Sequence, residues 1–155
     1  VPQSPRSTDA PMRFPRTVRL DAADAETFDP AAEPGEWAVS GAFAFSDREP
    51  ALLMGKDLQA FRSGFLGTGS FGWSSLVTVK DISPAEYERV VEALAAHLME
   101  RYDAPDRAAA RAFAEEECRF AQSLCDRPID TLVAVEREFG PQGIVERFRP
   151  VERPR

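Results

Sequence analysis

The segment over residues 83–102 constrains the fold most, because it carries both the start signals and the apolar stripe of an amphipathic helix. Ser83 stands at the N-cap, Pro84 occupies the first helical position, and Glu86 completes a capping box with Ser83. Apolar residues then recur at helical spacing along one stripe: Tyr87, Val90, Val91, Leu94, Leu98 and Met99. The sequence therefore predicts a helix over residues 83–102 that buries this stripe.

Apolar periodicity and turn residues predict the other elements. Two further helices are predicted over residues 51–67 and 104–126. Strands are predicted over residues 13–20, 36–45, 70–82, 131–139 and 143–152. The segment GPQG, residues 140–143, predicts a hairpin between the last two strands.

This order of elements, β-β-α-β-α-α-β-β, predicts an α+β fold. We expect an antiparallel or mixed sheet with about three helices on one face. Residues 1–11 hold three prolines and few large apolar groups, so we predict a disordered leader there. We expect a single domain over residues 12–150 and a short tail over residues 151–155.

Composition excludes several classes of partner. The chain has 155 residues and a formal net charge of -7, and an acidic domain repels the phosphate backbone of nucleic acids. No apolar run approaches the roughly 18 residues that a membrane span needs, and the leader has no apolar segment typical of a secretory signal. We therefore expect a soluble protein that binds neither nucleic acid nor membrane.

The two cysteines indicate a reducing compartment. Cys118 and Cys125 lie in one predicted helix, where seven residues span about 10 Å along the axis. This exceeds the Cα separation of about 7 Å that a disulfide tolerates. We therefore predict two free thiols and a cytoplasmic location.

The stretch GTGSFG, residues 67–72, matches the G-x-G-x-x-G pattern of nucleotide-binding loops. In a dinucleotide-binding fold this pattern follows a strand and opens a helix, whereas here a helix is predicted before it and a strand after it. A protein-kinase loop is also disfavoured, because the H-R-D and D-F-G motifs are missing from the sequence. We interpret Gly67 and Gly69 as residues that end the helix and turn the chain at positive φ, and we expect no cofactor.

Glu117 is the candidate catalytic residue. Helical spacing places it in an apolar stripe of the helix predicted over residues 104–126, and a desolvated carboxylate with a raised pKa can act as an acid or a base. The alternative is that it reaches the edge of the stripe or pairs with an arginine. His97, the only histidine, is interpreted as a helix-surface residue. Cys118 and Cys125 lack the spacing of zinc thiolates, so we predict no metal site.

The segment over residues 62–75 is the predicted binding surface, with Arg62, Phe65, Trp73 and Ser74 as its residues. It combines aromatic side chains and glycines without a catalytic constellation, and Trp and Arg are enriched in protein interfaces. Packing of Trp73 into the core is the alternative. The edge strands of the predicted sheet also leave a homodimer open.

Several segments together resemble a family of small bacterial proteins that is catalogued only as a domain of unknown function. The resemblance is carried by MRFPRTVRLDAAD, AAEPGEWAVSGAFAF, FRSGFLGTGSFGWSSLVTV, EEECRFAQSLCD and TLVAVE, and covers residues 12–149. It implies an accessory role, in the maturation of a redox enzyme, rather than an independent activity.

Three hypotheses follow from these residues. The first is a soluble accessory or binding protein that recognises another protein through residues 62–75. The second is a small-ligand-binding protein or minor enzyme that uses Glu117 as its acid or base. The third is redox or metal sensing at Cys118 and Cys125.

Overall fold

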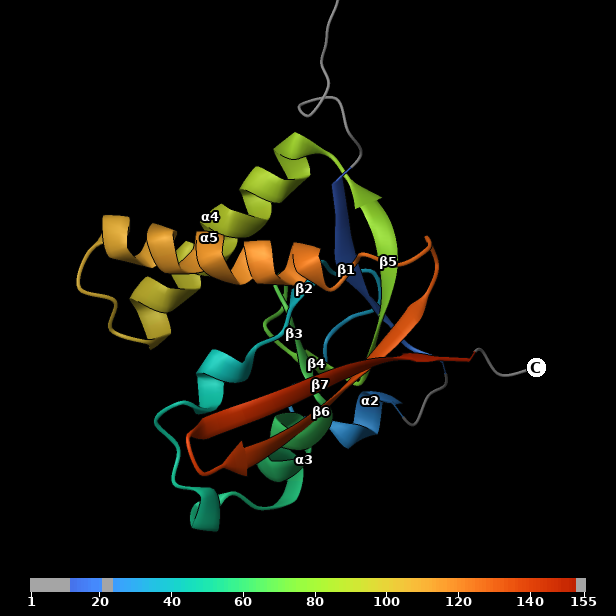
Figure 1. Ribbon diagram of the computed structural model, residues 1–155. Coiled ribbons are helices and arrows are strands. Elements are labelled where there is room, and N and C mark those ends of the chain that lie inside the picture. Colours follow the sequence, from blue (N-terminus) through green and yellow to red (C-terminus); the bar gives the residue numbers. More distant parts are fainter. Residues whose placement is uncertain (1–11, 21–23, 153–155) are drawn as a thin grey trace, which may run out of the picture.

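The computed structural model (Figure 1) describes residues 12–20 and 24–152 of the chain. It contains two antiparallel sheets and confirms the predicted α+β class and the order of the main elements. The predicted leader, residues 1–11, lies outside the described residues, as do residues 153–155 of the predicted tail.

The larger sheet has the strand order β1-β5-β6-β7, with every neighbouring pair antiparallel. Its strands are β1 (Met12–Val18), β5 (Leu76–Ile82), β6 (Leu132–Gly140) and β7 (Gly143–Val151). The predicted hairpin is confirmed: β6 and β7 pair from Leu132 with Val151 to Gly140 with Gly143. Gly143 adopts φ +120 at the turn, a conformation that L side chains rarely take.

The smaller sheet corrects two sequence predictions. It consists of β2 (Ala38–Val39), β3 (Phe65–Gly67) and β4 (Trp73–Ser74). The strand predicted over residues 36–45 shortens to β2 and is followed by a 3₁₀ helix, Ala42–Phe45. The helix predicted over residues 51–67 is α3 (Gly55–Ser63), and the residues after it form β3.

Two glycines packed against Trp73 explain these corrections. Gly41 adopts φ +85 and turns the chain, and a Cβ there would lie 2.7 Å from the Trp73 ring. Gly64 is extended at the end of α3, and a Cβ there would lie 2.9 Å from the same ring. Both close approaches depend on contacts between distant residues, so local periodicity does not report them.

The two long helices are α4 (Pro84–Arg101) and α5 (Arg107–Ser123). The capping box is confirmed: the Glu86 amide donates to Ser83 Oγ over 3.1 Å, and the Ser83 amide donates to Glu86 Oε1 over 3.0 Å. The stripe predicted for α4 is buried at Val90, Val91, Leu94 and Leu98. Met99 is an exception at 42% exposed, because it lies at the edge of the stripe.

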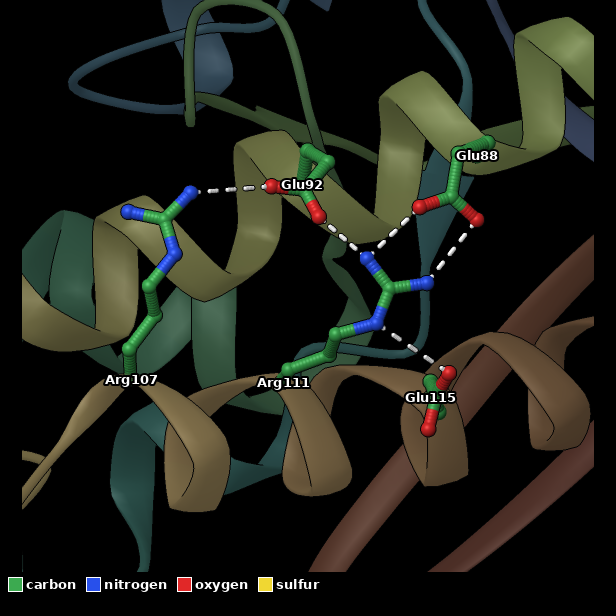
Figure 2. Close-up of polar contacts among 5 residues, drawn as sticks. All are labelled: Glu88, Glu92, Arg107, Arg111 and Glu115. Atoms are coloured by element: carbon green, nitrogen blue, oxygen red, sulfur yellow. Dashed lines mark hydrogen bonds and ion pairs between the residues drawn. The ribbon is translucent and has the colours of Figure 1, made fainter.

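Ion pairs join the solvent-facing sides of α4 and α5 (Figure 2). Arg111 of α5 lies between Glu88 and Glu92 of α4 and also pairs with Glu115 of its own helix. Its Nη1 is 2.6 Å from a Glu88 carboxylate oxygen, and the hydrogen bond from Arg111 lowers the pKa of Glu88. Arg107 pairs with Glu92 over 3.4 Å. These contacts favour one rotation of α5, which turns Ala110, Ala114, Cys118 and Ala121 into the core.

The helices and sheets enclose a core in three clusters. The first joins α4 and α5 to Phe14 of β1. In the second, Val133 and Val135 of β6 pack with Phe65 and Cys125, so the segment after α5 covers this face of β6, and α3 lies against the same strand. Cys118 and Cys125 are buried and free, as predicted, and burial raises the pKa of each thiol to about 12. Within the described residues, none of the helices has the length and apolar character that crossing a membrane requires.

Candidate functional site

The glycine loop, residues 67–72, binds a carboxylate of the chain itself. It connects β3 to β4, so it follows a strand and not the helix that was predicted before it. The amides of Gly69 and Ser70 donate to Glu36 Oε1 over 2.9 and 2.7 Å, and Ser70 Oγ donates to Glu36 Oε2 over 2.6 Å. The two amides that could have held a phosphate oxygen are thus hydrogen-bonded to Glu36.

The glycines of this loop allow neighbouring atoms to lie close to the backbone, and they do not adopt a positive φ. A Cβ at Gly67 would lie 2.4 Å from Glu36 Oε1, and one at Gly72 would lie 2.5 Å from the Ala31 backbone. The residue with positive φ is Phe71, at 58, which corrects the prediction made for Gly67 and Gly69. The Phe71 ring stacks on His97 with centroids 3.8 Å apart, and burial lowers the pKa of His97.

The four residues of the predicted binding surface do not lie together on one exposed face. Arg62 is exposed near the end of α3. Phe65 is fully buried, and Ser74 is buried with its hydroxyl donating to the Leu76 carbonyl over 2.8 Å. Trp73 is half-buried, with its ring centroid 5.2 Å from that of Phe45. Of these four residues, only Arg62 is therefore exposed.

Glu117 lies in a cleft of about 440 Å³. α5 supplies Glu117, and the opposite walls come from the 3₁₀ helix Ala42–Phe45, the segment after it and the tip of the β6–β7 hairpin. In Figure 1 this 3₁₀ helix, in cyan, lies between α5 and the hairpin. The apolar wall residues are Ala42, Phe43, Pro50, Phe139 and Ile144.

Glu117 has no hydrogen-bond or ion-pair partner in the part of the chain that the structure describes. Among residues 12–20 and 24–152, none donates a hydrogen bond or forms an ion pair with it. Burial raises the pKa of Glu117 to about 7, the negative charges of Glu146 and Glu116 add to the rise, and Arg137 opposes it. A carboxyl group with this pKa can exchange a proton near neutral pH or pair with an incoming cation.

A buried polar network lies behind Glu117, around the Arg137 side chain of β6, which is 0% exposed. Its Nε donates to Glu146 Oε2 over 2.9 Å, and its Nη2 donates to the Ser40 carbonyl over 2.9 Å. Its Nη1 donates to the Phe61 carbonyl over 2.7 Å. Ser40 Oγ also donates to Glu146 Oε2 over 2.6 Å. Burial lowers the pKa of Arg137, and the Glu146 charge opposes this.

Sequence reasoning missed this network, although one signal was present. Arg137 follows Val133 and Val135 at alternate positions of a strand, which places an arginine on the inward-facing side. A buried guanidinium needs a paired charge, and hairpin pairing from Gly140 and Gly143 places Glu146 opposite Arg137.

A second groove, of about 310 Å³, shares Phe43 and Ser46 with the cleft. The Phe43 ring contacts Tyr102 and Phe113 edge-on, with centroids 5.3 and 5.5 Å apart. Tyr102 and Phe113 are still 41% and 38% exposed. The cleft and the groove together form a surface with aromatic walls, with Glu117 in the cleft and Asp47 in the groove, which we call the Glu117 surface.

The Glu117 surface lacks the parts of a nucleophilic or metal centre within the described residues. Ser46, which lines both hollows, donates its hydroxyl to the Phe43 carbonyl over 2.9 Å and not to a base. Ser40 is buried and donates its hydroxyl to Glu146, and Cys118 lies in the core. In the part of the chain that the structure describes, no three His, Cys, Asp or Glu side chains are grouped to hold a metal ion. The arrangement suits recognition of a cation or a proton exchange.

Comparison with known proteins gives one family. A model described as "Family of unknown function (DUF6505)" matches residues 12–155. Searches of curated proteins and of solved structures give no match.

Proposed function

This chain belongs to that family of unknown function, and we propose that it is an accessory binding protein whose recognition site is the Glu117 surface. The observation that carries the proposal is the unpaired carboxylate of Glu117 among aromatic side chains that remain partly exposed. Exposed aromatic clusters are typical of protein interfaces. The recognition site proposed here is therefore the Glu117 surface and not residues 62–75. Three of the four contact residues predicted in that segment are buried or half-buried.

The proposal also covers the compartment of the protein and its role there. Two free, buried thiols support a cytoplasmic location. The resemblance described above supports an accessory role in the maturation of a redox enzyme. The partner on this view is another protein.

The test uses the tagged full-length chain, purified gently from its own host and examined by native mass spectrometry. We expect a protein that co-purifies at fixed stoichiometry with the wild type and is lost with Phe113→Ala. Phe120→Ala is the matched control, since Phe120 lies on the same helix, is 40% exposed and does not line the Glu117 surface. Equal co-purification with both variants, or none with the wild type, would contradict the proposal.

The second candidate is a small-ligand-binding protein or minor enzyme with Glu117 as its acid or base. It is favoured by the pKa of about 7 and by a cleft volume within the usual range of ligand pockets. In the same experiment, a small added mass that is lost in Glu117→Gln would favour it over a protein partner.

A further inference from the structure

We propose that the Glu117 surface receives a lysine or arginine side chain from a segment of a partner protein, with a large apolar residue of the same segment seated in the adjoining groove. This inference rests on the proposed function, because it requires the Glu117 surface to be the recognition site. It specifies the chemistry of the partner segment.

Charge complementarity is the first argument. Arg137 is committed to Glu146 and to three carbonyl groups, and Arg48 at the cleft wall is 3.3 Å from Asp57. No cation among the described residues pairs with Glu117. The negative charges that act on it are Glu146 on β7 and Glu116 on α5, and Asp47 lines the neighbouring groove. An incoming cation would supply the missing partner of Glu117.

The shape of the surface is the second argument. A lysine or arginine side chain has an apolar stem below its charged head, and Phe43, Phe139 and Ile144 offer apolar walls beside Glu117. The groove lined by Tyr102 and Phe113 shares Phe43 and Ser46 with this cleft, so the two hollows are neighbours. Two neighbouring side chains of one segment can therefore enter the two hollows together.

Proton linkage makes the inference measurable. Glu117 must be ionised to pair with a cation, and burial together with Glu146 and Glu116 raises its pKa to about 7 against the opposing charge of Arg137. Binding of a cation therefore releases a proton below neutral pH, and the dissociation constant should fall as the pH rises. With full ionisation in the complex, the fall between pH 6 and pH 8 is about tenfold.

The experiment pans a random twelve-residue peptide library on the immobilised full-length chain and counter-selects on Glu117→Gln. The dissociation constant of an enriched peptide is then measured by fluorescence anisotropy at pH 6 and pH 8. Glu26→Gln is the control, because it removes the same charge from an exposed residue that lines neither the cleft nor the groove. A peptide with norleucine in place of its lysine tests the cation directly.

We expect enriched peptides to carry Lys or Arg beside a large apolar residue and to bind Glu117→Gln at least tenfold more weakly. Glu26→Gln should change the dissociation constant less than twofold, and Glu117→Gln should abolish the dependence on pH. The absence of enriched peptides, enrichment of neutral peptides, equal binding to Glu117→Gln, or occupation of the cleft by a second copy of the chain or by a small amine would overturn the inference.

Failure of this inference can be distinguished from failure of the proposed function. If Phe113→Ala removes the co-purifying protein while Glu117→Gln does not, the proposed function stands. The inference that a basic side chain of the partner binds Glu117 is then wrong. If Phe113→Ala also leaves co-purification intact, the proposed function itself fails.

Discussion

Replacing Glu117 with glutamine should stabilise the protein at alkaline pH. Burial holds the pKa of Glu117 at about 7 in the folded state, against an ordinary value of 4.5. The folded chain therefore binds a proton that the unfolded chain has lost between these two pH values, and the free energy of unfolding falls as the pH rises through this window. Below pH 4.5 the carboxyl group is protonated in both states and has no such effect.

The size of the effect follows from the same two values. A pKa difference from 4.5 to about 7 corresponds to at most about 3.5 kcal/mol, at about 1.4 kcal/mol for each tenfold change. Glu117 is only partly buried, so we expect about 1–2 kcal/mol after allowance for solvent screening. Glutamine has nearly the same shape and no charge, so the variant should lack this destabilising contribution to the free energy of unfolding.

Urea unfolding at pH 4.5, 6 and 8, followed by circular dichroism, measures the difference. We expect Glu117→Gln and the wild type to coincide at pH 4.5, and the variant to be more stable by about 1–2 kcal/mol at pH 8. Glu26→Gln, which removes an exposed carboxylate that does not act on Glu117, should follow the wild type throughout. A difference that does not change with pH, or a variant less stable at pH 8, would refute the argument that Glu117 is desolvated.

Three other predictions concern the framework around the Glu117 surface. Arg137→Met should lower the free energy of unfolding by about 3–5 kcal/mol, because it leaves Glu146 without its ion-pair partner, and the double variant with Glu146→Leu should recover most of this loss in urea titrations. Gly72→Ala should cost about 1–3 kcal/mol by the same assay, because its Cβ would lie 2.5 Å from the Ala31 backbone; Gly69→Ala, whose nearest contact would be 3.2 Å, should cost clearly less. Both cysteine thiols should react with a maleimide at pH 8 only after denaturation, since both are buried with a pKa of about 12, and rapid labelling of the native protein would restore redox sensing as a hypothesis.

The features that sequence analysis predicted well depend on residues close together in the chain. The capping box needs only Ser83 and Glu86, and the β6–β7 hairpin needs only its turn residues and alternating strands. Glu117 was also found locally, since helical spacing alone places it beside a buried face of α5. Such signals depend on residues within one helical turn or one hairpin. They therefore do not depend on how the rest of the chain folds.

The errors arose where distant segments decide the local conformation. Residues 36–45 alternate like a strand, but Gly41 turns the chain where it meets Trp73. Residues 62–75 resemble an exposed recognition segment, but Phe65 packs against β5 and β6 and is fully buried. The glycine loop resembles an anion site, and its amides hold Glu36, more than thirty positions earlier in the chain.

The sequence by itself determined the α+β class, the two long helices, the closing hairpin, the free thiols and the candidate carboxylate. Only the tertiary structure decided that Glu117 is partly buried without a hydrogen-bond or ion-pair partner among the described residues, because pairing is a property of all the elements that meet at one point. Glu146 and Glu36 are held by Arg137 and by the glycine loop, whereas Glu117 meets apolar walls from three separate segments. A carboxylate is desolvated by what surrounds it in space, and that surrounding exists only once the chain has folded.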